Sequence, residues 1–240
     1  MPVVPHEGMY VGLLWLFHVV PQVKGYSPHK YLGGHVDCQL AYSLNGWHFL
    51  RCLREPFIPN GEPGSPDSGC VYPTYLLQKT EDELWIYASA CTHEHGYIPE
   101  GSGSLLTYRL RRDGFVYLSS CNGRGTVGTR PLHLRGGDVY VNVQCPAGEV
   151  RAQLTDSAGT TLEGYAFEDS EAFTGDRVDW SPIWAGGKSL RDLSGRAIRV
   201  ELELTNGNLY ALRGNFMVLT GYECKRFEKY GEIPAERPGF

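Results

Sequence analysis

Two carboxylates stand directly before apolar, strand-like segments of this chain. Glu7 precedes residues 9–17, and Asp67 precedes residues 70–75. Hydrolysis of a glycosidic bond requires one carboxylic acid that protonates the leaving oxygen and a second carboxylate that acts as nucleophile or activates water. We therefore take Glu7 and Asp67 as the candidate catalytic residues. The structural alternatives are a solvated turn residue at Glu7 and an Asx turn at Asp67, and at Asp67 the Asx turn is favoured.

A second set of side chains has the chemistry to bind a ligand rich in hydroxyl groups. His93 and His95 stand two apart, so both imidazoles point the same way if the segment is extended. We assign them to hydrogen bonding, because a His-x-His pair without a third ligand is a weak metal signal. Aromatic faces pack against sugar rings, and the candidates are Tyr72, Tyr97 and Trp47. Packing within strands is the alternative for these aromatic residues.

No metal site and no cofactor are predicted. His6, His18, His29 and His35 add imidazoles to one region, but their spacing fits no metal template. The seven cysteines are scattered without a Cys-x-x-Cys motif, which favours reduced thiols in a cytoplasmic protein. The sequence also lacks a P-loop, a GxGxxG in the right context and a G-x-S-x-G motif.

The composition limits the kinds of partner that this chain is expected to bind. The formal net charge of -5 gives no electrostatic reason to bind nucleic acid or an anionic membrane. The apolar run near the N-terminus ends at Val20, and it is too short to span a bilayer. Thirty Gly, fifteen Pro and fifteen Tyr indicate many short strands joined by tight turns, so an all-β protein is expected.

A strand-turn-strand unit that occurs twice must position the candidate side chains. Residues 9–17 lead to 39–49, and residues 83–90 lead to 105–118. The second strand of each copy closes on Asn45-Gly46 or Asp113-Gly114, which predicts a hairpin. The interval of roughly seventy residues is long enough for one propeller blade with long loops. The sequence therefore predicts about two blades of a β-propeller.

The pattern changes after residue 118. Residues 138–143, 149–154 and 198–204 alternate strictly between apolar and polar side chains, which is typical of a half-buried antiparallel sheet. We predict propeller blades over residues 1–118, a β-sandwich over 119–222 and a loosely held extension over 223–240.

Several segments resemble the closing blades of the five-bladed β-propeller of glycoside hydrolase families 32 and 43. These segments are Ser43-Leu44-Asn45-Gly46-Trp47-His48-Phe49, Asp67-Ser68-Gly69, and Leu84-Trp85-Ile86-Tyr87 followed by His95-Gly96. Asp192-Leu193-Ser194-Gly195-Arg196 and Leu209-Tyr210-Ala211-Leu212 resemble the β-sandwich that commonly follows such propellers. The resemblance implies a glycoside-hydrolase-like protein. The first blade of that family, which usually supplies the nucleophile or base, is not in this sequence.

The expected function is to act on or recognise carbohydrate, with hydrolysis of O-glycosidic bonds if the chain is active. The alternative is a non-catalytic carbohydrate-binding or interaction module. Two blades do not close a ring, and an open pair of blades exposes strand edges and apolar side walls. We therefore expect a homo-oligomer or a partner chain that supplies the missing blades.

Overall fold

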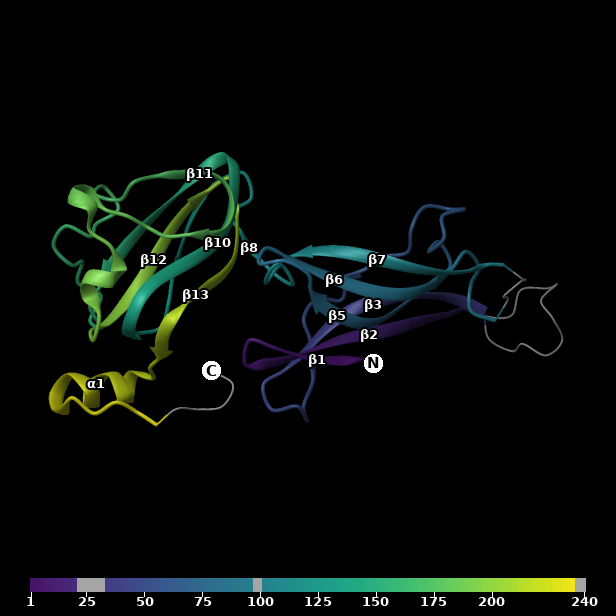
Figure 1. The fold of residues 1–240 in the computed structure, drawn as a ribbon, viewed down its shortest axis with the longest axis horizontal. Helices are drawn as coiled ribbons and strands as arrows, with labels where there is room; N and C mark the ends of the chain where they lie inside the picture. The colour runs from purple at the N-terminus through teal and green to yellow at the C-terminus, as the bar shows by residue number, and fades with distance from the viewer. Residues whose placement is uncertain (21–32, 97–100, 236–240) are drawn as a thin grey trace. The chain divides into compact units, whose positions relative to one another are not determined.

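The chain folds into two compact units, and most of its regular secondary structure is β-strand (Figure 1). The computed structural model describes residues 1–20, 33–96 and 101–235. One unit runs from Met1 to Arg112 and the second from Asp113 to Pro238. The boundary between the units therefore lies six residues before the end of the predicted first domain at residue 118. An all-β fold is confirmed.

The N-terminal unit is a curled, seven-stranded sheet with the order β1-β2-β3-β5-β6-β7, in which β4 also pairs with β3. Neighbouring strands are antiparallel except for β3 and β5, which form one parallel pair between Val36 and Cys70. The strands are β1 (Val3–His6), β2 (Met9–Val20), β3 (Gly33–Ser43), β4 (Leu50–Arg51), β5 (Cys70–Gln78), β6 (Glu83–Cys91) and β7 (Gly103–Arg111).

Strand β3 is buried on both faces, which explains its almost continuous run of buried side chains. The segment after β4 covers part of it: the Cys38 amide donates to the Ile58 carbonyl oxygen at 3.1 Å, and Gln39 Nε2 donates to the Arg54 carbonyl oxygen at 2.9 Å. A polar residue in such a strand needs a specific partner, because unpaired buried polar groups are costly. This requirement applies to Asp37 and Gln39, both of which are buried.

The two predicted turns have different outcomes. Asn45-Gly46 lies between β3 and β4, which pair as predicted, and Gly46 takes a positive φ of 75° there. Asp113-Gly114 does not form a hairpin, because β8 (Leu118–Ser119) pairs with β13 (Asn208–Val218) instead of returning onto β7. Asp113 forms an ion pair with Arg213 at 3.0 Å, so this turn opens the second unit.

The second unit is a six-stranded sheet with the order β8-β13-β10-β12-β9, in which β11 also pairs with β10. The predicted alternation is confirmed in β12, where Ile198, Val200, Leu202 and Leu204 are all buried. Residues 138–143 and 149–154 belong to one long strand that bends, and not to two. The remaining strands are β9 (Arg124–Gly128), β10 (Leu132–Thr155), β11 (Phe173–Trp180) and β12 (Ala197–Thr205), and the 3-10 helices are η1 (Ala185–Gly187) and η2 (Leu190–Leu193).

Helix α1 (Gly221–Tyr230) occupies part of the segment for which a loosely held extension is predicted. Thr220 and Glu223 form a capping box: Thr220 Oγ1 accepts from the Glu223 amide at 3.2 Å, and Glu223 Oε2 accepts from the Thr220 amide at 2.8 Å. Cys224 is buried and Phe227 contacts His133 of β10, so the helix packs on the second unit. No helix within the described ranges is long and apolar enough to cross a membrane.

Candidate functional site

The Asp67 carboxylate borders a cavity of about 340 Å³ in the N-terminal unit. The wall combines a phenol, an amide and a carboxylate with apolar and aromatic surface. Its lining residues include Phe57, Asn60, Asp67, Ile86 and Tyr108. Ligand pockets typically have such a mixture, in which a few polar groups orient a ligand against apolar walls.

Two hydroxyl groups hold the Asp67 carboxylate in place. Ser65 Oγ donates to Oδ1 at 2.7 Å, and the Tyr108 hydroxyl donates to Oδ2 at 2.8 Å. Partial burial raises the pKa of Asp67, but the hydrogen bonds from Ser65 and Tyr108 outweigh burial and leave this pKa below its ordinary value. Burial and the adjacent Asp67 carboxylate raise the pKa of Tyr108. At neutral pH the site therefore presents a carboxylate beside a protonated phenol.

Two glycines allow the loop before β5 to fold closely around Asp67. A Cβ atom on Gly61 would lie 2.2 Å from Asp67 Oδ1, and the Gly61 amide donates to the Asp67 carbonyl oxygen at 3.3 Å. A Cβ atom on Gly69 would lie 2.1 Å from the backbone carbonyl carbon of His93. Ser68 Oγ also donates to the Thr92 carbonyl oxygen at 3.0 Å. The Asp67 loop and the His93 segment therefore pack against each other.

The predicted histidine pair lies beside the end of the β2–β3 hairpin. His95 forms a bridge with Gly34, and its ring contacts Phe17 with a centroid separation of 4.7 Å. The exposed His93 has Thr92 Oγ1 at 2.7 Å from its Nδ1. Both histidines are exposed, and His95 makes an aromatic contact while His93 lies beside the Asp67 loop.

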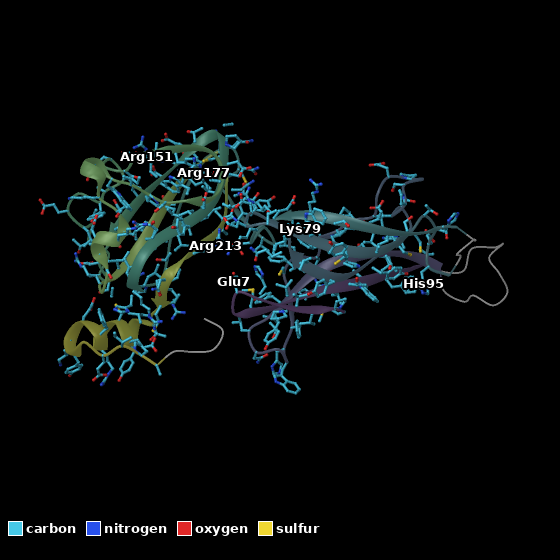
Figure 2. All side chains as sticks on the ribbon, in the orientation of Figure 1. Glu7, Lys79, His95, Arg151, Arg177 and Arg213 are labelled. Carbon is cyan, nitrogen blue, oxygen red and sulfur yellow. The ribbon has the colours of Figure 1, made fainter. Side chains whose placement is uncertain are left out.

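Glu7 lies far from the histidine pair, in the β1–β2 turn, where its φ is 43°. Its side chain is 60% exposed and lies 3.9 Å from the Arg112 guanidinium. Glu7 adjoins Met9 at the start of β2, whereas His95 adjoins Gly34, which pairs with Val19 near the end of β2. Ten residues of strand separate these positions, or roughly 30 Å. Figure 2 shows Glu7 and His95 toward opposite ends of this sheet.

Glu7 is not held together with Asp67 either. Asp67 is fixed by Tyr108, whereas Glu7 pairs with Arg112, four residues further along the chain. Because β7 ends at Arg111, the Cα atoms of Tyr108 and Arg112 are at most about 13 Å apart. The two carboxyl groups of a glycosidase are about 5–9.5 Å apart. Glu7 and Asp67, the predicted catalytic pair, therefore make their contacts at separate points of the unit.

The predicted aromatic residues do not form one platform. The Tyr72 ring packs edge-on against Trp15 with a centroid separation of 5.4 Å, so its contact is within the sheet. Trp47 is 87% exposed in the loop that follows Asn45-Gly46. Tyr97 lies outside the described residues. In the second unit, Trp184 is fully buried and Trp180 nearly so, which leaves neither ring available as a sugar-binding face.

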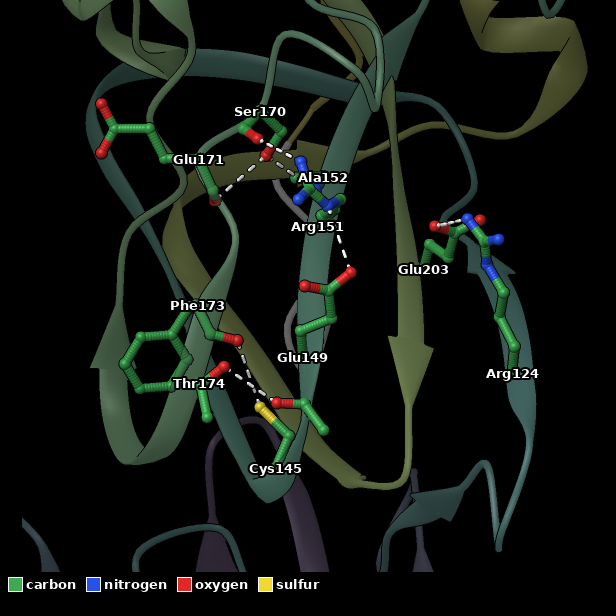
Figure 3. Close-up of polar contacts among 11 residues, drawn as sticks. Arg124, Cys145, Glu149, Arg151, Ala152, Ser170, Glu171, Phe173, Thr174 and Glu203 are labelled. Carbon is green, nitrogen blue, oxygen red and sulfur yellow. Dashed lines mark hydrogen bonds and ion pairs between the residues drawn. The ribbon is translucent and has the colours of Figure 1, made fainter.

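Polar contacts in the second unit support its sheet. Arg151 lies between Glu149 and the Ser170 carbonyl oxygen, at 3.3 and 2.9 Å, and Ser170 Oγ accepts from the Ala152 amide at 3.1 Å (Figure 3). Trp184 Nε1 also donates to the Ala152 carbonyl oxygen at 2.9 Å. These contacts fix loop segments onto β10, which is a structural role.

Two features of the N-terminal unit were missed from the sequence. Tyr108 is 41 residues from Asp67, and only the curled sheet brings its hydroxyl to that carboxylate. The second feature is a group of metal-ligating side chains, His18, His35 and Asp37, whose ligand atoms all lie within 4.8 Å of one another. The sequence contains one signal for this group, the His35-x-Asp37 spacing within an apolar strand, which places both side chains on one face.

Comparison with known proteins gives no family. No family model matches the chain, and no curated protein or solved structure matches it. The function must therefore be argued from the geometry of the two units.

Proposed function

We propose that this chain recognises carbohydrate through the cavity beside Asp67. The observation that carries the proposal is one cavity in which an ionised carboxylate, a phenol, an amide and aromatic surface converge. Sugar hydroxyls donate to carboxylates, and the C–H faces of sugar rings pack on aromatic side chains. The cavity of about 340 Å³ lies at the small end of ligand pockets and suits one or two sugar units.

Recognition is favoured over glycoside hydrolysis. Hydrolysis needs a second carboxyl group at a short, defined distance from the first. Glu7 faces Arg112 at the β1–β2 turn, and Asp67 is held by Ser65 and Tyr108. A catalytic acid also needs a raised pKa, whereas the pKa of Asp67 is lowered. Asp67 is therefore better suited to accept hydroxyl donors than to donate a proton.

We also propose that the N-terminal sheet is two blades of a partial propeller and that the second unit is a β-sandwich. The support is the division of the first sheet into two antiparallel groups, β1–β4 and β5–β7, linked by the single parallel pair of β3 and β5. Within the described ranges, β7 pairs on one side only, with β6. An exposed edge strand is a template for another chain, so a second copy or a partner chain completes the sheet.

Glycan-array binding combined with a turnover assay tests the carbohydrate proposal. We expect saturable binding to a subset of glycans, abolished in Asp67→Asn and retained in Glu7→Gln, with no release of reducing sugar. Binding that survives Asp67→Asn would contradict the proposed site. Turnover by the wild type that is lost in Glu7→Gln would show that the chain hydrolyses glycosidic bonds and does not only recognise carbohydrate.

Light scattering of the full chain tests the partner proposal separately. We expect a mass of at least two chains, or a complex with a copurifying chain. A monodisperse 26.7 kDa monomer would contradict it.

A further inference from the structure

Three side chains from neighbouring strands converge on one face of the N-terminal sheet. His18 of β2 lies directly opposite His35 of β3 in the antiparallel register, and Asp37 follows two residues along β3. Residues two apart in a strand share a face, so all three side chains project from the same side. The His18 and His35 rings are stacked, with centroids 4.3 Å apart and an interplanar angle of 13°.

Asp37 is buried with only half of its carboxylate engaged. Its side chain is 4% exposed, and Oδ2 lies 2.7 Å from His18 Nε2. Oδ1 is buried and has no hydrogen-bond partner in the described part of the chain. No lysine or arginine from the described ranges pairs with this carboxylate. A buried carboxylate oxygen without a hydrogen-bond partner destabilises the fold, so the site is incomplete as it stands.

A hydrogen-bonded His–Asp pair is the alternative explanation. It accounts for the contact between His18 and Asp37, but it leaves Oδ1 of Asp37 unsatisfied. It also gives no role to the His35 ring, which is stacked on His18 although strand pairing would tolerate many residue types there. A bound cation accounts for all three side chains together.

We propose that His18, His35 and Asp37 bind one divalent transition-metal ion, with zinc as the reference metal. Two imidazoles and a carboxylate form a donor set that zinc and iron(II) sites use with open positions. Tetrahedral ligands at about 2.0–2.1 Å from one ion are about 3.3 Å apart, so the 2.7 Å between His18 Nε2 and Asp37 Oδ2 widens by about half an ångström when the ion binds. The metal takes the place of the proton that these two atoms share.

The exposure of the site allows the ion to enter. The His18 side chain is 36% exposed and His35 is half-buried, whereas Asp37 forms the floor. The three ligands occupy one side of the ion, which leaves positions for water or a small ligand. Nitrogen donors disfavour magnesium and calcium, which prefer oxygen ligands. The proposal rests on β2 and β3 and is independent of carbohydrate binding at Asp67.

Titration of the metal-free, reduced full chain tests the site, with Zn²⁺ followed by calorimetry and Co²⁺ by absorption. We expect one equivalent of either ion to bind, with proton release and without the intense thiolate-to-cobalt absorption that a cysteine ligand gives. A tenfold excess of Mg²⁺ is not expected to compete. Absence of binding at one equivalent, or a thiolate signal, would overturn the proposal.

Matched variants locate the ion. His35→Ala and the nearly isosteric Asp37→Asn are each expected to weaken metal binding by more than roughly 10- to 100-fold. That range is the loss of affinity when a residue that only hydrogen-bonds to a metal ligand is removed. His48→Ala is the control, because His48 is exposed and bonds to Asn45 outside this cluster. Unchanged binding in both cluster variants would contradict the site. X-ray absorption of the zinc-loaded wild type tests the site without any variant. Sulfur among the atoms bound to zinc would also contradict the site.

Discussion

The Asp67 carboxylate is stabilised in its charged form by Ser65 and Tyr108, and this has a measurable pH dependence. Because its pKa is lower in the folded state, the ionised group stabilises the fold above its unfolded pKa of about 3.9. That contribution is lost as the pH falls through the lower, folded value. Tyr108→Phe keeps the ring and removes the hydroxyl donor, so we expect the Asp67 pKa to rise. Carboxyl NMR titration measures it, and Tyr87→Phe serves as the control. An unchanged pKa would show that Tyr108 does not stabilise the carboxylate.

His133 is predicted to make the second unit sensitive to mild acid. Burial, with a smaller effect of Arg135, lowers the pKa of His133, and its Nδ1 is buried without a partner among the described residues. The neutral ring is therefore favoured in the fold, and stability is lost as the pH falls below the unfolded value of about 6.5. The protection factors of the β10 amides, which correct each exchange rate for its intrinsic dependence on pH, should fall between pH 7 and pH 5.

The other seven histidines all belong to the first unit, so His133→Gln isolates this effect. We expect the variant to remove most of the pH dependence of the β10 protection factors over that range. The same fall in protection in the variant would show that His133 is not its source.

At the scale of elements, the Asp67 loop allows two glycine substitutions to be compared. Gly61→Ala would push on the ends of two side chains, Asp67 and Ser65, which are able to move. Gly69→Ala would collide with the His93 backbone, which is not able to move aside. We expect Gly61→Ala to weaken glycan binding with little loss of stability, and Gly69→Ala to destabilise the unit by about 1–3 kcal/mol. Urea unfolding measures both, and equal losses of stability would contradict this account of the loop.

Helix α1 depends on its N-terminal cap. Thr220 Oγ1 accepts from the Glu223 amide, so Thr220→Ala removes an acceptor and should cost about 1 kcal/mol. Thr220→Ser retains the hydroxyl and should cost much less. Hydrogen exchange of the α1 amides reports the local effect. Equal protection in the Ala and Ser variants would show that the cap does not hold the helix.

Across the whole molecule, the sequence predicts those structural features that depend on residues close together in the chain. Alternation over residues 198–204 is sufficient to predict β12, because burial of every second side chain is a local property. Thr220-x-x-Glu223 is also a local signal for a helix start, although the polar composition of the segment favours a loosely held extension. The all-β class follows from the same local evidence.

The sites depend on pairings that no local pattern contains. His18 and His35 are 17 residues apart, and only the register of β2 on β3 places them opposite each other. Asp113-Gly114 has the composition of a hairpin turn, yet β8 pairs with a distant strand, because turn chemistry does not specify the partner. Glu7 has the residue type of a catalytic acid but faces Arg112.

The most direct test of carbohydrate recognition is a map of ligand-induced amide shifts in the full chain. A panel of free hexoses, pentoses and disaccharides is titrated while backbone NMR spectra are recorded. The account predicts saturable shifts centred on Asn60, Asp67 and Tyr108 for at least one sugar, and their loss in Asp67→Asn. An absence of saturable shifts for every sugar, or shifts centred on the second unit, would contradict it.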